Sequence, residues 1–247
     1  MFKIEILGVK VANITMQQAI EAIKNTIDNS EKKKMYFVNA DCLNKVWKDS
    51  EYKQILNKTD FIFGDGSGVR LASKILDNEI IDNINGTDML PLLCRQCENS
   101  GHSIFLLGAK PGVAEKVKQN LEEKFPDLKI AGFQHGYFDL DKENEEVISK
   151  INNSKADILL VAFGAPDQEK WIHSNFKKLK PNVSIGVGGL LDFFSGNMPR
   201  APKWMRSFGI EWIYRLLQEP GRMWKRYILG NPLFIYRVYK WKKEKGI

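Results

Sequence analysis

The fold is decided by the segment Ala156-Asp157-Ile158-Leu159-Leu160-Val161-Ala162-Phe163-Gly164, a short apolar run that ends in glycine. A continuous apolar run of this length, rich in leucine, isoleucine and valine, is typical of a strand buried on both faces. Four further segments have the same character: 34–39, 60–64, 103–108 and 183–188. Between the strands lie amphipathic stretches such as 112–125 and 142–152, in which apolar residues recur at helical spacing. This alternation predicts the α/β class, with a Rossmann-like parallel sheet covered by helices.

The bulk composition indicates a folded protein. The 247 residues are 43% hydrophobic and 27% charged, which is typical of a chain that buries a core. The N-terminus begins with alternating charge instead of a signal peptide, and the apolar run 158–163 is far shorter than the ~20 residues that span a bilayer. We therefore expect a cytoplasmic protein. Cys94 and Cys97 form a C-x-x-C pair, but the sequence from Leu90 reads as a helix start, so we expect inert helix cysteines.

The strand-like segments end in small, polar or charged residues. These endings are Asn39-Ala40-Asp41, Gly64-Asp65-Gly66-Ser67-Gly68, Gly108-Ala109-Lys110-Pro111-Gly112, Gly164-Ala165-Pro166-Asp167-Gln168 and Gly188-Gly189. Ligands of parallel sheets bind beyond the carboxyl ends of the strands, where glycine lets backbone amides approach a phosphate. Several such loops in one chain indicate a bound anionic ligand. The chain lacks the P-loop pattern, and no dinucleotide-binding fingerprint is supported.

Asp65 is the outstanding candidate for catalysis. It stands between two glycines directly after an apolar strand, at a turn from strand to helix. A carboxylate in such a turn is exposed to a ligand at the sheet edge. Spacing alone leaves a second interpretation equally open, in which Asp65 caps a helix that begins near Ser67. Asp88, in Asn85-Gly86-Thr87-Asp88, is similar, but its position favours a turn or N-cap residue.

Several motifs also resemble one family of enzymes. In chain order they are Asn39-Ala40-Asp41, Gly64-Asp65-Gly66, Asn85-Gly86-Thr87-Asp88, Leu107-Gly108-Ala109-Lys110-Pro111-Gly112, Gly164-Ala165-Pro166-Asp167-Gln168-Glu169-Lys170-Trp171, Gly186-Val187-Gly188-Gly189 with Asp192, Arg200-Ala201-Pro202-Lys203-Trp204 and Glu211-Trp212-Ile213-Tyr214-Arg215-Leu216-Leu217-Gln218-Glu219-Pro220. Together they resemble the WecG/TagA/CpsF glycosyltransferases nearly end to end. Within that family the pattern is closest to the enzymes of teichoic acid synthesis.

The resemblance implies an inverting, metal-independent transfer of N-acetylmannosamine from UDP-ManNAc to the 4-hydroxyl of GlcNAc on undecaprenyl diphosphate. This product is the linkage disaccharide of wall teichoic acid. Asp65 matches the family's proposed general base, and Asn39 matches an active-site polar residue. Two positions depart from the family pattern: Phe37 stands where threonine is often found, and Asn83 stands where arginine is often found. Both departures bear on the acceptor contacts and on the sugar.

The residues can perform this chemistry, and we expect neither a cofactor nor a metal ion. An inverting transferase needs a carboxylate that takes the acceptor hydroxyl proton and positive charge for the departing UDP. The residues expected to bind the substrates are Gly108, Tyr137, Gly164, Pro166, Gln168, Gly188, Asp192 and Asp88. Tyr137 is suited to stack on uracil and Asp192 to hold the ribose. For these two side chains, packing and helix capping stay open as alternatives.

The basic charge is concentrated in the last 45 residues. From Lys203 onward the net charge is +8, whereas the first 202 residues carry −1. The same tail holds four of the six tryptophans and four of the seven tyrosines, and Trp204, Phe208 and Trp212 recur at helical spacing. Such a composition suits the headgroup layer of an anionic membrane. A helix packed on the core and a nucleic-acid patch are the alternatives, although no nucleic-acid-binding module is visible.

We expect two parts: a catalytic α/β domain over 1–196 and a basic aromatic helical appendage over 197–247. Truncation near Asn197 is expected to leave a folded core. The resemblance favours an appendage that docks on the membrane and folds over the active site, so that Arg215 and Arg222 reach the diphosphates.

The expected partners are a UDP-sugar donor, an undecaprenyl-diphosphate-linked acceptor and an anionic membrane surface at the inner face of the cell membrane. No nucleic acid is expected, and a homo-oligomer stays open. Two other functions compete with this interpretation. One is a transferase of the same family that uses another UDP-hexose for capsule or exopolysaccharide, and the other is a nucleotide-sugar-binding regulator without catalysis.

Overall fold

The computed structural model describes residues 2–246 of the chain. The first residue of the expected catalytic domain and the last residue of the expected appendage therefore lie outside the described residues. Its centre is a six-stranded sheet in the order β4-β3-β8-β7-β5-β6, in which all neighbouring strands run parallel. The strands are β3 (Lys33–Val38), β4 (Phe61–Gly64), β5 (Ser103–Gly108), β6 (Lys129–Gln134), β7 (Ile158–Ala162) and β8 (Val183–Gly186). The predicted α/β class with a parallel sheet is confirmed.

Three strands fall outside the predicted set. β6 forms one edge of the sheet, and most of its residues are only partly buried. The other two are β1 (Lys3–Ile6) and β2 (Val9–Ala12), which pair antiparallel as a separate hairpin. The five apolar runs that were predicted as strands all lie inside the sheet or at its β4 edge.

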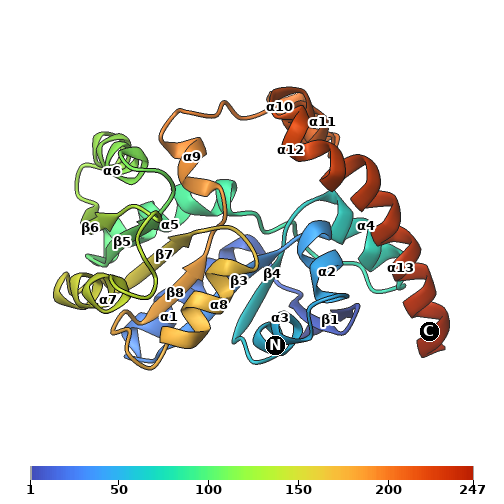
Figure 1. The fold of residues 1–247 in the computed structure, drawn as a ribbon, viewed down its shortest axis with the longest axis horizontal. Helices are drawn as coiled ribbons and strands as arrows, with labels where there is room; N and C mark the ends of the chain where they lie inside the picture. The colour runs from blue at the N-terminus through green and yellow to red at the C-terminus, as the bar shows by residue number, and fades with distance from the viewer. Residues whose placement is uncertain (1, 247) are drawn as a thin grey trace.

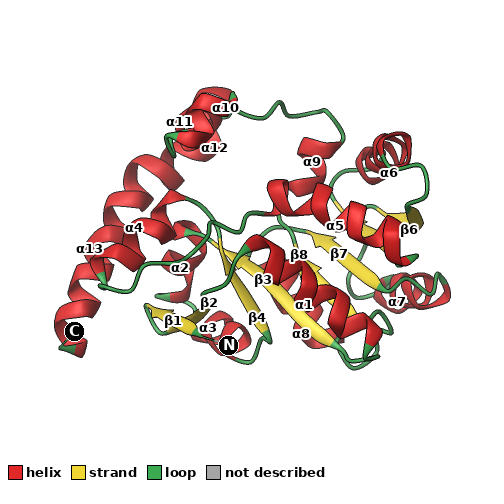
Figure 2. Ribbon diagram, turned by 180° about the vertical axis from the view of Figure 1, so that it is seen from behind, coloured by secondary structure: helices red, strands yellow, loops and turns green. Residues whose placement is uncertain are grey.

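Helices cover both faces of the sheet (Figures 1 and 2). Two separate apolar clusters are buried between the helices and the sheet. One cluster joins the sheet to α1, α5, α6 and α9, and the other joins it to α2, α3, α4, α7, α8 and α13. These helices are α1 (Met16–Asp28), α2 (Ala40–Val46), α3 (Ser50–Asn57), α4 (Ser67–Ile75), α5 (Gly86–Ser100), α6 (Val113–Lys124), α7 (Asn144–Asn153), α8 (Asp167–Asn175), α9 (Leu190–Phe194) and α13 (Gly230–Lys245).

Helix α5 begins earlier than the sequence suggested. Asn85 is its N-cap, and the side-chain Oδ1 of Asn85 accepts a hydrogen bond of 2.8 Å from the backbone N–H of Asp88. The helix start predicted near Leu90 is therefore wrong, and the N-cap is Asn85 instead of Asp88. Cys94 and Cys97 are buried inside this helix, and burial raises the pKa of the Cys97 thiol to about 12. Such a thiol is an inert helix residue at neutral pH.

The last 45 residues are largely helical. Three short helices, α10 (Lys203–Ser207), α11 (Glu211–Gln218) and α12 (Pro220–Trp224), lead through a π-helical turn (Lys225–Leu229) into α13. Figure 1 shows α13 running from the short helices alongside α4 and α2. Phe234 and Val238 of α13 are completely buried in the core. Within residues 2–246, every helix is too short or too polar to cross a bilayer.

Candidate active site

Four strands of the sheet end at the wall of one cleft with a volume of about 780 Å³. These strands are β3, β4, β7 and β8, which bring their carboxyl ends to the same edge because they run parallel. Residues of α10, α11, α12, α13 and the π-helical turn also line the cleft. The sequence-predicted residues that line this cleft are Asn39, Asp65, Gly164, Gln168, Gly188, Arg215 and Arg222.

Asp65 lies partly buried in the cleft wall, directly after β4. Its backbone N–H donates to Val38 O at 2.9 Å, which ties the turn to the end of β3. Gly66 follows with φ of +92°, a conformation that favours glycine, and is itself the N-cap of α4. The interpretation of Asp65 as the cap of this helix is therefore not supported. The turn instead presents the carboxylate to the cleft.

The carboxylate of Asp65 holds its proton more tightly than an ordinary aspartate. Burial raises its pKa from 3.8 to about 6, against the opposing effect of the nearby guanidinium groups of Arg215 and Arg226. Glu211 raises the pKa further, and the side chain of Asn39 lowers it. A carboxylate with this pKa is mostly ionised at neutral pH and is still basic enough to accept a proton.

Asn39 connects the end of β3 to α2. Its Oδ1 accepts hydrogen bonds of 3.1 Å from the backbone N–H groups of Asp41 and Cys42, so it is the N-cap of α2. This capping fixes the side chain at the cleft wall beside Asp65. Sequence reasoning assigned Asn39 to the site, and the helix cap explains how the residue is held there.

Gln168 ties two strand-end loops together. Its Oε1 accepts from Gly188 N at 2.8 Å and from Gly164 N at 3.2 Å, and so joins the loops after β8 and β7. Its Nε2 donates to Glu169 Oε1 at 2.8 Å. Gln168 is 3% exposed, so its polar atoms serve the protein itself. Glu169 is buried too, and burial raises its pKa to about 7, although the hydrogen bond from Gln168 opposes this shift.

The cleft is strongly cationic. Eight of its lining residues are basic, whereas only Asp41, Asp65 and Glu211 are acidic. The basic residues are Lys45, Lys48, Arg206, Arg215, Arg222, Lys225, Arg226 and Arg237. This excess of positive charge, beside glycine loops and helix N-termini, is suited to a diphosphate.

The two arginines predicted from the sequence lie in different surroundings. The guanidinium of Arg215 lies 4.7 Å from the ring centre of Phe193, and its buried Nε has no hydrogen-bond partner within residues 2–246. Arg222 is exposed and pairs with Glu219 at 2.6 Å. Arg226 is partly buried and lies 4.0 Å from Asp41. Arg215 and Arg226 are the cations whose charges act most on Asp65.

Five predicted binding residues lie outside the cleft lining: Gly108, Tyr137, Pro166, Asp192 and Asp88. Gly108 has φ of +127°, and a Cβ there would come within 2.5 Å of Ala162 O, so backbone packing requires this glycine. Tyr137 is 67% exposed. Asp192 lies in the first turn of α9. Asp88 pairs with Arg200 at 2.7 Å, and although burial would raise its pKa, this contact and its other partners lower it.

Two further side chains shape the site in ways that the sequence did not reveal. Lys45 donates to Ala165 O at 2.7 Å and pairs with Asp41 at 3.0 Å, so it links α2 to the loop after β7. Asn83, which departs from the family pattern, accepts from Gly66 N at 2.6 Å and supports the turn that carries Asp65. Both roles depend on contacts between distant segments, which spacing along the chain does not reveal.

Metal ligands are sparse around the cleft. The sequence contains one D-x-D, Asp139-Leu140-Asp141, a pattern that binds divalent metal in many glycosyltransferases. It lies on a turn outside the cleft lining, where Asp139 Oδ1 accepts from the backbone N–H of Asp141 at 3.0 Å. Among residues 2–246, no group of three His, Cys, Asp or Glu side chains could hold a metal ion.

A parallel α/β sheet with a carboxylate in a cationic cleft at its carboxyl edge is typical of an enzyme that acts on a phosphorylated ligand. Residues 4–246 match the model of the glycosyl transferase WecG/TagA/CpsF family. The chain belongs to this family and is a glycosyltransferase, as the motifs of the sequence predicted.

Named relatives agree with this assignment. The chain is 34% identical over 246 residues to the N-acetylglucosaminyldiphosphoundecaprenol N-acetyl-beta-D-mannosaminyltransferase of Staphylococcus aureus strain MW2. The alignment covers 98% of this chain and 94% of that relative. The protein of the same name from strain NCTC 8325 has the same identity and coverage.

Proposed function

We propose that this protein transfers N-acetylmannosamine from UDP-ManNAc to GlcNAc-diphospho-undecaprenol, with inversion, to form the linkage unit of wall teichoic acid. The names of the relatives from Staphylococcus aureus support the donor sugar and the acceptor. The observation that carries the proposal is the position of Asp65, whose carboxylate lies in a cationic cleft at the end of β4. A non-catalytic regulator would gain nothing from an anion beside the phosphates of its ligand.

In this mechanism Asp65 is the general base. As the acceptor 4-hydroxyl oxygen forms its bond to C1 of the donor sugar, Asp65 takes the hydroxyl proton and the bond from C1 to the UDP oxygen breaks. Attack opposite to the leaving group inverts the configuration at C1. Asn39, beside Asp65 in the wall, is placed to orient the sugar hydroxyls.

The UDP leaving group departs with additional negative charge, which the cleft must stabilise. Arg215 and Arg226 are placed for this role because both lie close to Asp65, and Arg222 lines the same cleft. The N–H groups of Gly164 and Gly188 in the loops after β7 and β8 already donate to Gln168 Oε1, so this role falls to the arginines. We propose that the three arginines, without a divalent metal, bear the charge of the diphosphate.

The appendage is proposed to bring the enzyme to its lipid-linked acceptor. Large apolar side chains of this region are exposed: Trp204, Phe208, Leu217, Trp224, Leu229, Tyr236 and Tyr239. Together with the +8 charge from Lys203 onward, they suit insertion into the headgroups of an anionic leaflet. We propose a peripheral position on the cytoplasmic face of the cell membrane.

A donor screen tests the proposal. UDP release is measured with UDP-ManNAc, UDP-GlcNAc, UDP-glucose and UDP-mannose, each with a short-chain lipid-diphosphate GlcNAc acceptor. We expect turnover with UDP-ManNAc only in the presence of acceptor. Preferred turnover with another UDP-hexose would instead support a family member of capsule or exopolysaccharide synthesis.

Arginine variants extend the same assay. Arg215→Ala and Arg222→Ala should each lower turnover, and Arg95→Ala is the matched control because Arg95 is exposed on α5, away from the cleft. Equal turnover in the Arg215, Arg222 and control variants would refute the proposed role of the appendage at the diphosphate.

A further inference from the structure

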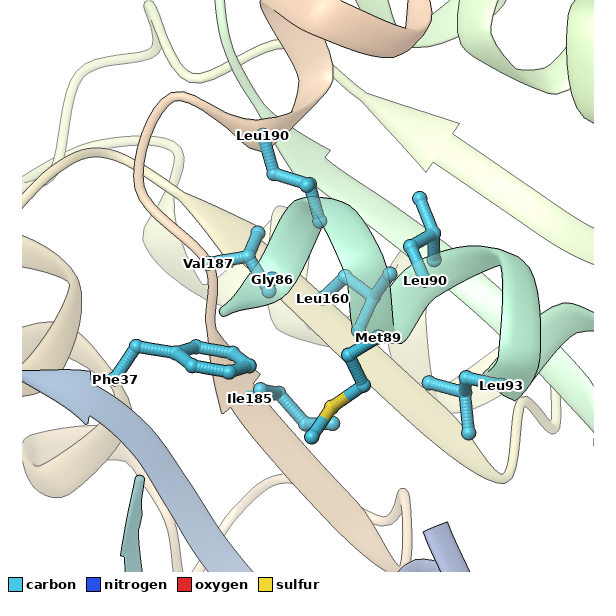
Figure 3. Close-up of a pocket in the computed structure, with 9 residues that line it drawn as sticks. All are labelled: Phe37, Gly86, Met89, Leu90, Leu93, Leu160, Ile185, Val187 and Leu190. Atoms are coloured by element: carbon cyan, nitrogen blue, oxygen red, sulfur yellow. The ribbon is translucent and has the colours of Figure 1, made fainter. Parts of the chain in front are cut away.

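A small apolar cavity opens beside the catalytic cleft (Figure 3). The nine residues that line it are all apolar, and its volume is about 10 Å³. A space of this size holds about one water-sized group, but a water molecule would find no polar partner in the lining. The cavity is therefore suited to a single methyl group.

The cavity and the cleft share part of their walls. Phe37, Gly86, Val187 and Leu190 line both of them, so the cavity adjoins the space in which a ligand of the cleft would lie. Deeper in the cavity lie side chains such as Met89 of α5, which is 2% exposed. Figure 3 shows Phe37 and Ile185 from the sheet facing Met89 of the helix across this space.

The cavity lies next to the proposed catalytic residues. Phe37 and Asn39 stand two residues apart at the end of β3, and alternate residues of a strand point to the same face. Phe37 is therefore about 7 Å along the strand from Asn39, a separation comparable to a sugar ring. In the neighbouring strand, Phe63 and Asp65 have the same spacing, and the rings of Phe37 and Phe63 lie 5.5 Å apart.

We propose that this cavity, which we call the methyl niche, binds the acetamido methyl group of the donor N-acetylhexosamine. On an N-acetylated sugar nucleotide, the acetyl methyl is the apolar group attached beside the reacting C1. Val187 of the niche directly precedes Gly188, which lines the cleft after β8. The niche thus lies beside the loops at the carboxyl ends of the strands, where the donor is proposed to bind.

The inference rests on the proposed function in that the donor is a UDP-linked N-acetylhexosamine. It adds the origin of donor specificity: a hydroxyl in place of the acetamido group would leave the niche empty. A longer acyl chain would not fit, because Met89, Leu90 and Leu93 close the inner end.

Gly86 provides a precise probe of the niche. A Cβ at this position would lie 3.6 Å from Leu190 Cδ1 and 3.8 Å from Phe37 Cε2, which is ordinary van der Waals contact. Gly86→Ala is therefore compatible with the fold and fills part of the niche with a methyl group of its own. Leu92→Ala is the control, because Leu92 is 47% exposed on the outer side of the same helix.

Calorimetric titration of the full-length protein with UDP-ManNAc, UDP-mannose and UDP tests the proposal. We expect wild-type protein to bind UDP-ManNAc about 10-fold more tightly than UDP-mannose, as for a methyl-sized group in a fitted apolar pocket. Gly86→Ala should abolish most of this preference and leave UDP affinity unchanged, whereas Leu92→Ala should keep both. With wild-type protein, the N-propionyl analogue of UDP-ManNAc should bind more weakly than UDP-ManNAc itself.

Each other outcome overturns the assignment. Equal affinity of the wild type for UDP-ManNAc and UDP-mannose, or a preference that survives in Gly86→Ala, would place the acetyl group elsewhere. An effect of Gly86→Ala on the KM of the GlcNAc-lipid acceptor, with donor affinity unchanged, would assign the niche to the acceptor and overturn the donor site. These binding data are independent of turnover. A lack of turnover with UDP-ManNAc would therefore refute the proposed function, but it would not decide whether the niche binds the acetyl methyl group.

Discussion

Replacing the proposed base by asparagine separates catalysis from stability. Asp65→Asn keeps the shape of the side chain but cannot accept the proton of the acceptor hydroxyl, and loss of an acid–base group lowers turnover by ~10²–10⁴-fold. The same change removes a carboxylate whose pKa is raised to about 6 by burial, so we expect the variant to be more stable than the wild type. A merely structural aspartate would give the opposite result.

The stability gain follows from the pKa. A shift of about two pKa units, from 3.8 to about 6, corresponds to at most ~3 kcal/mol. Because Asp65 lines a solvent-filled cleft, we expect ~1 kcal/mol, or a rise in Tm of ~2–4 °C for a chain of this size. A carboxyl whose pKa is raised on folding destabilises the protein only where it is ionised, so the gain is fully present above pH 6 and vanishes below pH 4.

The measurements are UDP release at saturating acceptor and thermal unfolding at pH 4 and pH 7.5. For the wild type, kcat/KM should rise with pH through about 6, because protonated Asp65 cannot act as a base. The buried Glu169, with a pKa of about 7, is the other carboxyl that titrates in this range, so Glu169→Gln should retain the rise near 6. Near-normal turnover in Asp65→Asn, or a loss of turnover caused by unfolding, would refute the assignment.

Three further outcomes test other parts of the site. Activity should survive EDTA, and a loss that magnesium or manganese restores would contradict metal-independent transfer. Gln168→Met leaves two loop N–H groups without their acceptor, which costs ~1–3 kcal/mol for each buried group. The Tm should therefore fall, and the donor KM should rise more than kcat falls. Unchanged kinetics would contradict the positioning role of Gln168. The double variant Trp204→Ser/Phe208→Ser should sediment less with anionic vesicles than Ile81→Ser, a change at a similarly exposed apolar residue, and equal sedimentation would refute membrane docking.

The parallel sheet could be predicted because its inner strands are continuous apolar runs. β6 escaped prediction because it is an edge strand in which Ala131 and Gly132 interrupt the apolar pattern. The hairpin of β1 and β2 could have been recognised: apolar and charged residues alternate in Lys3–Ile6, and the turn residues Leu7 and Gly8 both have positive φ. Its two strands are only four residues long, which makes the alternation easy to overlook.

The candidate site was predictable where it depends on the turn that directly follows a strand. Asp65 follows β4 at once, so its place at the sheet edge needed no knowledge of distant contacts. The positions of Arg226 and Lys45 depend on how the C-terminal helices lie against α2, which no local pattern encodes. Tyr137 was expected to stack on uracil, but the residue is 67% exposed and lies outside the cleft lining.

The appendage has two physical roles, and a truncation would remove both of them at once. Its short helices line the cleft, whereas Phe234, Val238 and Trp241 of α13 are buried in the same core cluster as α2 and α4. Burial of three such side chains contributes roughly 5–9 kcal/mol. Because a domain is stable by only ~5–15 kcal/mol, a chain ending near Asn197 would lose much of its stability together with its cleft wall. Substitutions in Lys203–Trp224 leave α13 in place, and they therefore test docking and catalysis on a protein that is still folded.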